Sequence, residues 1–108
     1  MFKLAEKKTL TWPVTVNIPQ DGGKTTKATF TGEFEVLDQD EMFEVTAEGG
    51  DMLERALVGW KGYTDHEGSE IPFSDEARKK LFVINYVRVA LFTAYGEINN
   101  GRAAARKN

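Results

Sequence analysis

Two stretches of strictly alternating apolar and polar residues, separated by a short turn-rich segment, constrain this chain more than any other feature of its sequence. The first covers residues 10–18 and the second residues 28–36, and threonine fills many of the polar positions. A period of two is typical of strands with one buried face. The sequence therefore predicts an antiparallel β-hairpin with strands at about 9–18 and 26–37.

The length of the turn follows from the numbering of the apolar residues in the two strands. Apolar residues are even-numbered in both, so a two-residue turn would set apolar positions of one strand against polar positions of the other. A three-residue loop, Asp21-Gly22-Gly23, avoids this mismatch. It predicts the pairs Leu10 with Phe34, Trp12 with Gly32, Val14 with Phe30, and Val16 with Ala28. Pro13 lacks an N–H donor, which predicts that the first strand lies at an edge of the sheet.

Three to four helices are predicted after the hairpin, at about 39–48, 51–60, 75–84 and 86–100. Asp38 or Asp40 can cap the first, which ends at two glycines, and Ser74 and Asn85 can cap the third and fourth. The second helix has an apolar stripe consisting of Met52, Leu53, Ala56, Leu57 and Trp60.

These elements predict a single α+β domain spanning residues 1–108, with a short flexible N-terminus at about 1–7 and a basic tail at about 101–108. The last helix is too apolar on all sides for a lone surface helix. It is therefore expected either to be buried in the fold or to present a surface to a partner.

Composition excludes several classes of function. The formal net charge is -3, and no lysine or arginine occurs from residue 33 to residue 54, so a nucleic-acid partner is not expected. The sequence has no cysteine, which excludes disulfides and thiolate metal sites. The longest apolar stretch, residues 81–98, is interrupted by polar and charged residues, so no membrane segment is expected.

Candidate catalytic and metal groups are sparse. His66 is the only histidine, and its neighbours Asp65 and Glu67 cannot converge with it on one ion, so a solvated loop is favoured. The serines are Ser69 and Ser74, and Ser74 already has a capping role, which disfavours a catalytic triad. Residues 38–41 lack the pattern of a calcium loop, and residues 21–24 do not precede a helix that could bind phosphate. We therefore predict no catalytic residue, no metal and no cofactor.

Three short motifs resemble a known family in their order and spacing. They are Leu57-Val-Gly-Trp60, the Gly-bounded acidic loop at residues 61–68, and Ile71-Pro-Phe-Ser74. Together with the double-glycine turn and the terminal Arg106-Lys107-Asn108, this order is similar to the tail assembly chaperones of long-tailed bacteriophages. In that family the first motif ends a helix and the third begins one.

The resemblance implies a non-enzymatic chaperone in the cytoplasm of an infected or lysogenic bacterium. It would bind the tape measure protein and prevent its aggregation until tail tube protein polymerises around it. It would also self-associate and be absent from the mature virion. The alternative is a structural virion protein of the tail or of the head–tail connector.

The family motifs do not assign contact residues. The apolar side chains that exceed the needs of the hairpin are our candidates for binding a partner, and an ordinary place in the core remains open for each of them. They are Met42, Phe43, Trp60, Val87, Leu91 and Tyr95.

Overall fold

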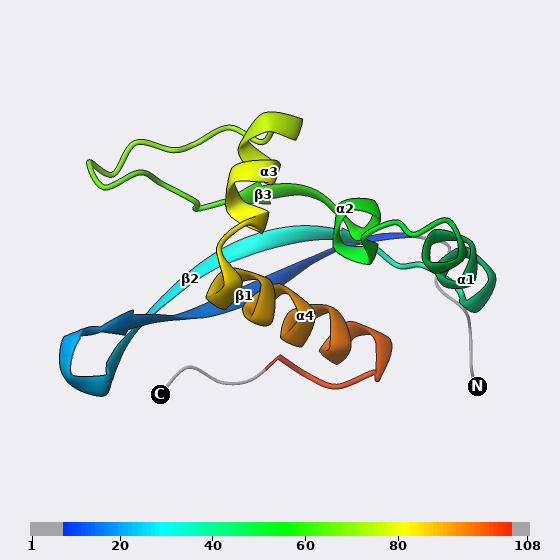
Figure 1. Ribbon diagram of the computed structural model, residues 1–108, viewed down its shortest axis with the longest axis horizontal. Coiled ribbons are helices and arrows are strands. Elements are labelled where there is room, and N and C mark those ends of the chain that lie inside the picture. The colour runs from blue at the N-terminus through cyan, green and yellow to red at the C-terminus, as the bar shows by residue number, and fades with distance from the viewer. Residues whose placement is uncertain (1–7, 105–108) are drawn as a thin grey trace.

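A computed structural model describes residues 8–104 of the chain as a three-stranded antiparallel sheet with helices packed against it (Figure 1). The α+β class and the N-terminal hairpin are therefore confirmed. The N-terminal segment 1–7, and residues 105–108 of the basic tail with its Arg-Lys-Asn motif, lie outside the described residues.

The hairpin has the predicted register throughout. Strand β1 (Thr9–Gln20) pairs with β2 (Lys24–Glu35), and all four predicted pairs are present. A short 3-10 turn, Asp21–Gly23, supplies the three-residue loop. Gly22 and Gly23 have φ angles of 80° and 79°, a conformation that residues with a side chain rarely adopt. The two glycines therefore allow the three-residue loop that sets apolar residues of the two strands opposite each other.

The two prolines of β1 lie where they cost no sheet hydrogen bond. The Val36 N–H donates to the Lys8 carbonyl at 2.7 Å, so the even-numbered residues of β1 form the hydrogen-bonded pairs with β2. Odd-numbered residues therefore point their backbone groups away from β2. Pro13 and Pro19 are odd-numbered, and β1 is an edge strand as predicted. The missing N–H groups make this edge a poor template for an added strand.

The predicted helix at 51–60 is wrong over its second half. The helix α2 covers only Met52–Ala56, and Leu57–Lys61 forms a third strand, β3, along the free edge of β2. The Leu-Val-Gly-Trp motif is therefore a strand, not the helix end that the resemblance implied. Val58 and Gly59 have low helix propensity, and pairing with β2 supplies the backbone partners that decide the conformation.

A bulge explains why the apolar residues of this strand have the spacing of a helix face. Leu57 lies opposite Phe34 and Trp60 lies opposite Gly32, both on the inner face of β2, although the two residues are three apart. The register shift beside Glu33 inserts one extra residue into β3, which brings both side chains to the same side of the sheet. Spacing of three along the sequence is therefore compatible with either conformation.

The remaining helices begin close to where capping residues predict. Helix α1 (Gln39–Ala47) begins with a capping box, in which the Glu41 N–H donates to Asp38 Oδ1 at 2.8 Å and the Asp38 N–H donates to Glu41 Oε1 at 3.2 Å. Ser74 caps α3 (Asp75–Phe82) by accepting from the Ala77 N–H at 3.0 Å. Asn85 does not cap α4 (Asn85–Asn99). It is the first helical residue, and the cap position belongs to Ile84.

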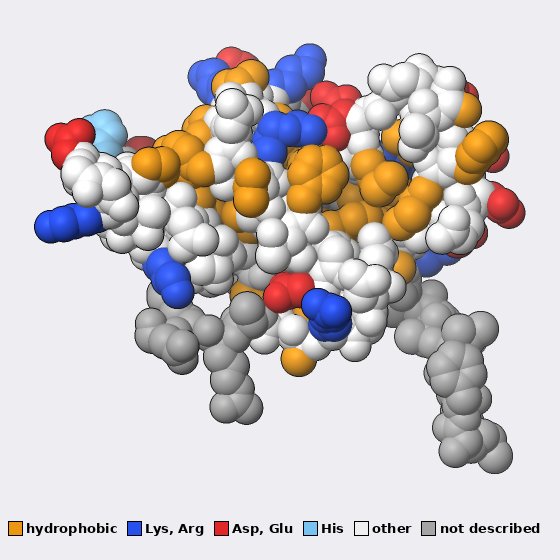
Figure 2. Space-filling model, turned by 60° about the horizontal axis from the view of Figure 1, so that its bottom comes forward, with side chains coloured by type: hydrophobic (Ala, Val, Ile, Leu, Met, Phe, Trp, Pro, Cys, Tyr) orange, Lys and Arg blue, Asp and Glu red, His pale blue; other side chains and the backbone are white. Residues whose placement is uncertain are grey.

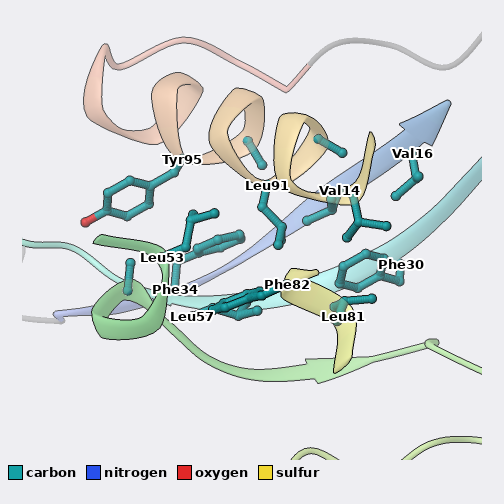
Figure 3. Packing of buried hydrophobic residues seen from close by; sticks show 14 residues of the cluster. Val14, Val16, Phe30, Phe34, Leu53, Leu57, Leu81, Phe82, Leu91 and Tyr95 are labelled. Carbon is teal, nitrogen blue, oxygen red and sulfur yellow. The ribbon is translucent and has the colours of Figure 1, made fainter. Parts of the chain in front are cut away.

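The hydrophobic core lies between the inner face of the sheet and helices α2, α3 and α4 (Figure 3). Its fully buried large side chains are Val14, Phe34, Leu53, Leu57 and Leu91. Tyr95 closes one end of the core, since its ring lies 5.8 Å from that of Phe34 and its hydroxyl bonds to the backbone of Glu35 and Leu37. Near the same end of α4, Trp12 Nε1 donates to Glu97 Oε1 at 3.0 Å, which ties the helix to β1.

Candidate functional site

The accessible face of α4 and the corner before it carry a row of large apolar side chains. Val83, Tyr86, Val89 and Phe92 follow one another at intervals of three residues, and their exposed fractions are 79%, 39%, 66% and 46%. We call these four residues the α4 stripe. In Figure 2 hydrophobic side chains gather in a band across one face of the molecule, bordered by charged groups. Such a gathering on a small protein is typical of a binding surface.

The stripe exists because both sides of α4 are apolar. The buried side packs against the sheet and consists of Val87, Ala90, Leu91, Ala94 and Tyr95. At about 100° per residue, positions 89 and 92 fall on the opposite side of the helix from these. The core therefore accounts for one face of α4 and leaves the other without a partner in the described chain.

Arg88 holds one edge of the stripe in place. Its Nη1 lies 2.8 Å from Asp51 Oδ2, and its guanidinium lies 5.5 Å from the centre of the Phe92 ring and 5.7 Å from that of Phe82. Burial alone would raise the pKa of Asp51. Hydrogen bonds from Arg88 and from the Leu53 N–H outweigh it and hold this pKa below its ordinary value. The arginine thus links the exposed ring of the stripe to helix α2.

An apolar hollow of about 240 Å³ adjoins the N-terminal end of the stripe. It lies between the far half of the hairpin, the turn after β3 and the corner between α3 and α4. Its lining includes Ile18, Ala28, Phe30, Ile84 and Tyr86. Tyr86 belongs to both features, so the hollow and the α4 stripe form one continuous surface.

Three of the predicted contact residues are inside the fold. Val87, Leu91 and Tyr95 are 5%, 0% and 2% exposed, and the protein's own core covers them. They pack on the sheet because they share the helix face that carries the two small residues Ala90 and Ala94. The large apolar residues of α4 that are exposed are instead Tyr86, Val89 and Phe92 of the stripe.

The other three predicted contact residues differ in accessibility. Phe43 projects from α1 and is 74% exposed. Met42, its neighbour, is partly buried against the core. Trp60 is also partly buried, with its ring edge-on to Tyr63 and Phe73 and its Nε1 donating to the Ile71 carbonyl at 2.7 Å. Phe43 therefore remains a surface candidate, whereas Trp60 organises the loop that follows β3.

The sequence indicates that α4 has more apolar residues than one buried side needs, but its periodicity does not show which of them are exposed. Residues 86–95 are apolar at nearly every position, so the pattern shows an excess of apolar surface but not which side faces the sheet. The small residues Ala90 and Ala94 are the clue to the buried side, because close packing on a strand favours small side chains.

The side chains considered for catalysis are used structurally or exposed. Asp65 Oδ1 accepts from the N–H groups of Glu67 and Ser69, which shapes the loop around the exposed His66, and Ser74 caps α3. Within residues 8–104 no group of three or more acidic or histidine side chains is placed to hold a metal ion.

No single helix in the described part of the chain is long and apolar enough to cross a membrane. Helices α3 and α4 are long and apolar enough only when counted as one segment, and they are bent by 104° at the break between them.

Comparisons of the chain with models of protein families, with curated proteins and with solved structures give no match. The surface chemistry and the sequence motifs are therefore the basis on which a function can be proposed.

Proposed function

We propose that this protein is a non-enzymatic tail assembly chaperone of a long-tailed bacteriophage, which binds the tape measure protein and prevents its aggregation before the tail tube polymerises. The observation that carries the proposal is the α4 stripe, a row of exposed apolar side chains on α4 and the corner before it. The order of the sequence motifs supports it.

The chemistry of the stripe suits an amphipathic helical client. Tyr86, Val89 and Phe92 on α4, with Val83 on the corner before it, offer an apolar surface to the anchors that an amphipathic helix presents at i, i+3, i+4 and i+7. Burying apolar surface contributes about 25 cal/mol per Å² before the costs of association are subtracted. A single stripe therefore supports reversible binding, which a chaperone that later releases its client to the tail tube protein needs.

Polar and charged groups around the stripe fit a protein that must stay dispersed while it holds an apolar client. Arg88 and its partner Asp51 lie along one side, and helix α1 is rich in acidic residues beyond it. The proposal also includes self-association of the chaperone and action in the host cytoplasm, with the protein absent from the finished particle.

Co-expression with fragments of the tape measure protein from the same phage tests this proposal. The full chain should co-purify with a helical fragment and keep it in the supernatant after centrifugation. Val89→Asp should reduce recovery of the fragment at least tenfold, because it places a charge in the middle of the stripe. Val58→Asp, which makes the same change at an exposed valine of β3, is the matched control and should leave recovery unchanged.

Failure to bind any tape measure fragment would overturn the proposal, as would equal losses from both variants. Mass spectrometry of purified virions addresses the alternative that the protein is a structural component of the tail or connector. A chaperone should be absent or present in traces, whereas stoichiometric amounts would favour the structural protein.

A further inference from the structure

We infer that the hollow beside Tyr86 is an anchor pocket, which receives one large apolar side chain of the amphipathic helix that lies along the α4 stripe. This inference deepens the proposed function and rests on it for the identity of the client. It adds a specific pocket, the class of side chain that fills it and the direction in which the bound helix extends.

The pocket exists because the hairpin is longer than the helices that cover it. Strands β1 and β2 have 12 residues each, whereas α4 begins only at Asn85 and runs away from the turn of the hairpin (Figure 1). The inner face of the far half therefore has no helix over it. Ile18 and Ala28 of the hairpin line the pocket there, together with Tyr63 from the turn after β3 and Tyr86 from α4.

The lining selects an uncharged apolar group. Every residue that lines the hollow is uncharged, and most are aliphatic or aromatic. A dry cavity of about 150 Å³ is enough to hold a benzene ring. A volume of about 240 Å³ therefore accommodates the side chain of a phenylalanine or leucine that enters from the open side.

The position of the pocket favours a helix as the occupant over a strand. Pro13 and Pro19 remove donors from the free edge of β1, so strand addition at this edge is disfavoured. Tyr86 and Phe92 are separated by six residues of α4, which corresponds to about 9 Å along the helix axis. Anchors at i and i+7 of a bound helix are about 10.5 Å apart, so one anchor can enter the pocket while another reaches Phe92.

Charge indicates how the bound helix extends. The pocket is at the N-terminal end of α4, while the other end approaches α1, since the Tyr95 hydroxyl accepts from the Leu37 N–H just before α1 begins. Helix α1 and its flanks carry Asp40, Glu44 and Glu48, all exposed. A client helix with its anchor in the pocket and its lysines or arginines at the remote end is therefore complementary to this surface.

A model helix tests the pocket independently of the phage client. The probe is an 18-residue amphipathic peptide of leucine, glutamine and lysine, with one 4-fluorophenylalanine in the apolar stripe near one end and the lysines near the other. Binding to the full-length protein is followed by fluorine NMR of that ring. Ala28→Leu adds bulk at a residue that lines the pocket and should weaken binding at least tenfold. Thr31→Leu adds the same side chain to the outer face of β2 and should leave the dissociation constant within twofold.

Each outcome bears on the inference. Equal affinities for the two variants, or no binding of the peptide by the unmodified protein, would overturn the pocket. Self-association that Ala28→Leu abolishes, measured by sedimentation, would assign the hollow to a second copy and also overturn it. If a tape measure fragment binds the protein and the Ala28→Leu variant equally, the pocket fails while the proposed function stands. If the peptide occupies the pocket but no tape measure fragment binds, the pocket stands and the proposed function fails.

Discussion

Replacing Tyr95 with phenylalanine should destabilise the protein more than the loss of one oxygen atom suggests. The hydroxyl accepts from the Leu37 N–H and donates to the Glu35 carbonyl, each at 3.0 Å. Both Leu37 and Tyr95 are buried, so water cannot replace these bonds without rearrangement. The aromatic ring and its packing on Phe34 are retained in the variant. The change therefore isolates the polar contribution.

The magnitude follows from what is left behind. A buried backbone group that loses its partner costs about 1–3 kcal/mol, and in the variant the Leu37 N–H loses the hydroxyl oxygen that accepts its hydrogen bond. With a smaller loss at the Glu35 carbonyl, the free energy of unfolding should fall by about 2–3 kcal/mol. For a urea m value of about 1.5 kcal/mol per M, the midpoint should drop by about 1.5 M.

Equilibrium urea unfolding followed by tryptophan fluorescence measures this shift. Tyr86→Phe is the matched control, because that ring is exposed and its hydroxyl has no hydrogen-bond partner in the described part of the chain. The control should change stability by less than about 0.5 kcal/mol. A difference between the two variants of less than about 0.5 kcal/mol would refute the reasoning.

The pH dependence supplies a second check on the same residue. Burial raises the pKa of Tyr95 above its ordinary value of 10.0, because the phenolate is disfavoured inside the protein. The unfolded chain therefore ionises first, and this tyrosine's contribution to stability is complete below pH 10 and is lost as the pH rises through the folded-state pKa. The Tyr95→Phe variant lacks that loss. The stability gap between protein and variant should therefore narrow above pH 10.

Three further predictions concern stability and use the same unfolding assay. Gly32→Ala should lower the free energy of unfolding by about 1–3 kcal/mol, because the new Cβ would lie 2.7 Å from the buried ring of Phe34. Gly96→Ala should raise it by about 0.5–1 kcal/mol, because this glycine is in a helix and its new Cβ would have no neighbour within 4 Å. Equal effects would contradict this packing. Ser74→Ala should cost about 1 kcal/mol through loss of the α3 cap, and an unchanged midpoint would argue against the cap. Because the pKa of Asp51 is lowered in the folded protein, this carboxylate stabilises the fold above about pH 3.8, and that stabilisation is lost as the pH falls through the folded-state pKa. Asp51→Asn should therefore make the free energy of unfolding less dependent on pH in acid. An unchanged pH dependence would count against the ion pair.

Much of the candidate site could not be predicted from the sequence, for identifiable reasons. Phe43, a predicted contact residue, is exposed on α1 among acidic residues, and its binding to a partner stays a prediction. The predicted contact residues Val87, Leu91 and Tyr95 lie on the buried side of α4, a helix that is apolar on both of its sides. The hollow also had no sequence signal, since its walls come from the hairpin, the turn after β3 and the α3–α4 corner.

The sequence by itself determined the hairpin, its register and most helix starts. Alternation, an odd loop length and capping side chains act over a few residues, so their consequences can be worked out locally. Only the tertiary structure decided that Leu57–Lys61 becomes a strand and which side of α4 faces the sheet. Both outcomes depend on groups distant in sequence: the unpaired edge of β2 in the first case, and the inner face of the hairpin in the second. Packing on the sheet therefore separates the core side of α4 from the exposed stripe on which the proposed function depends.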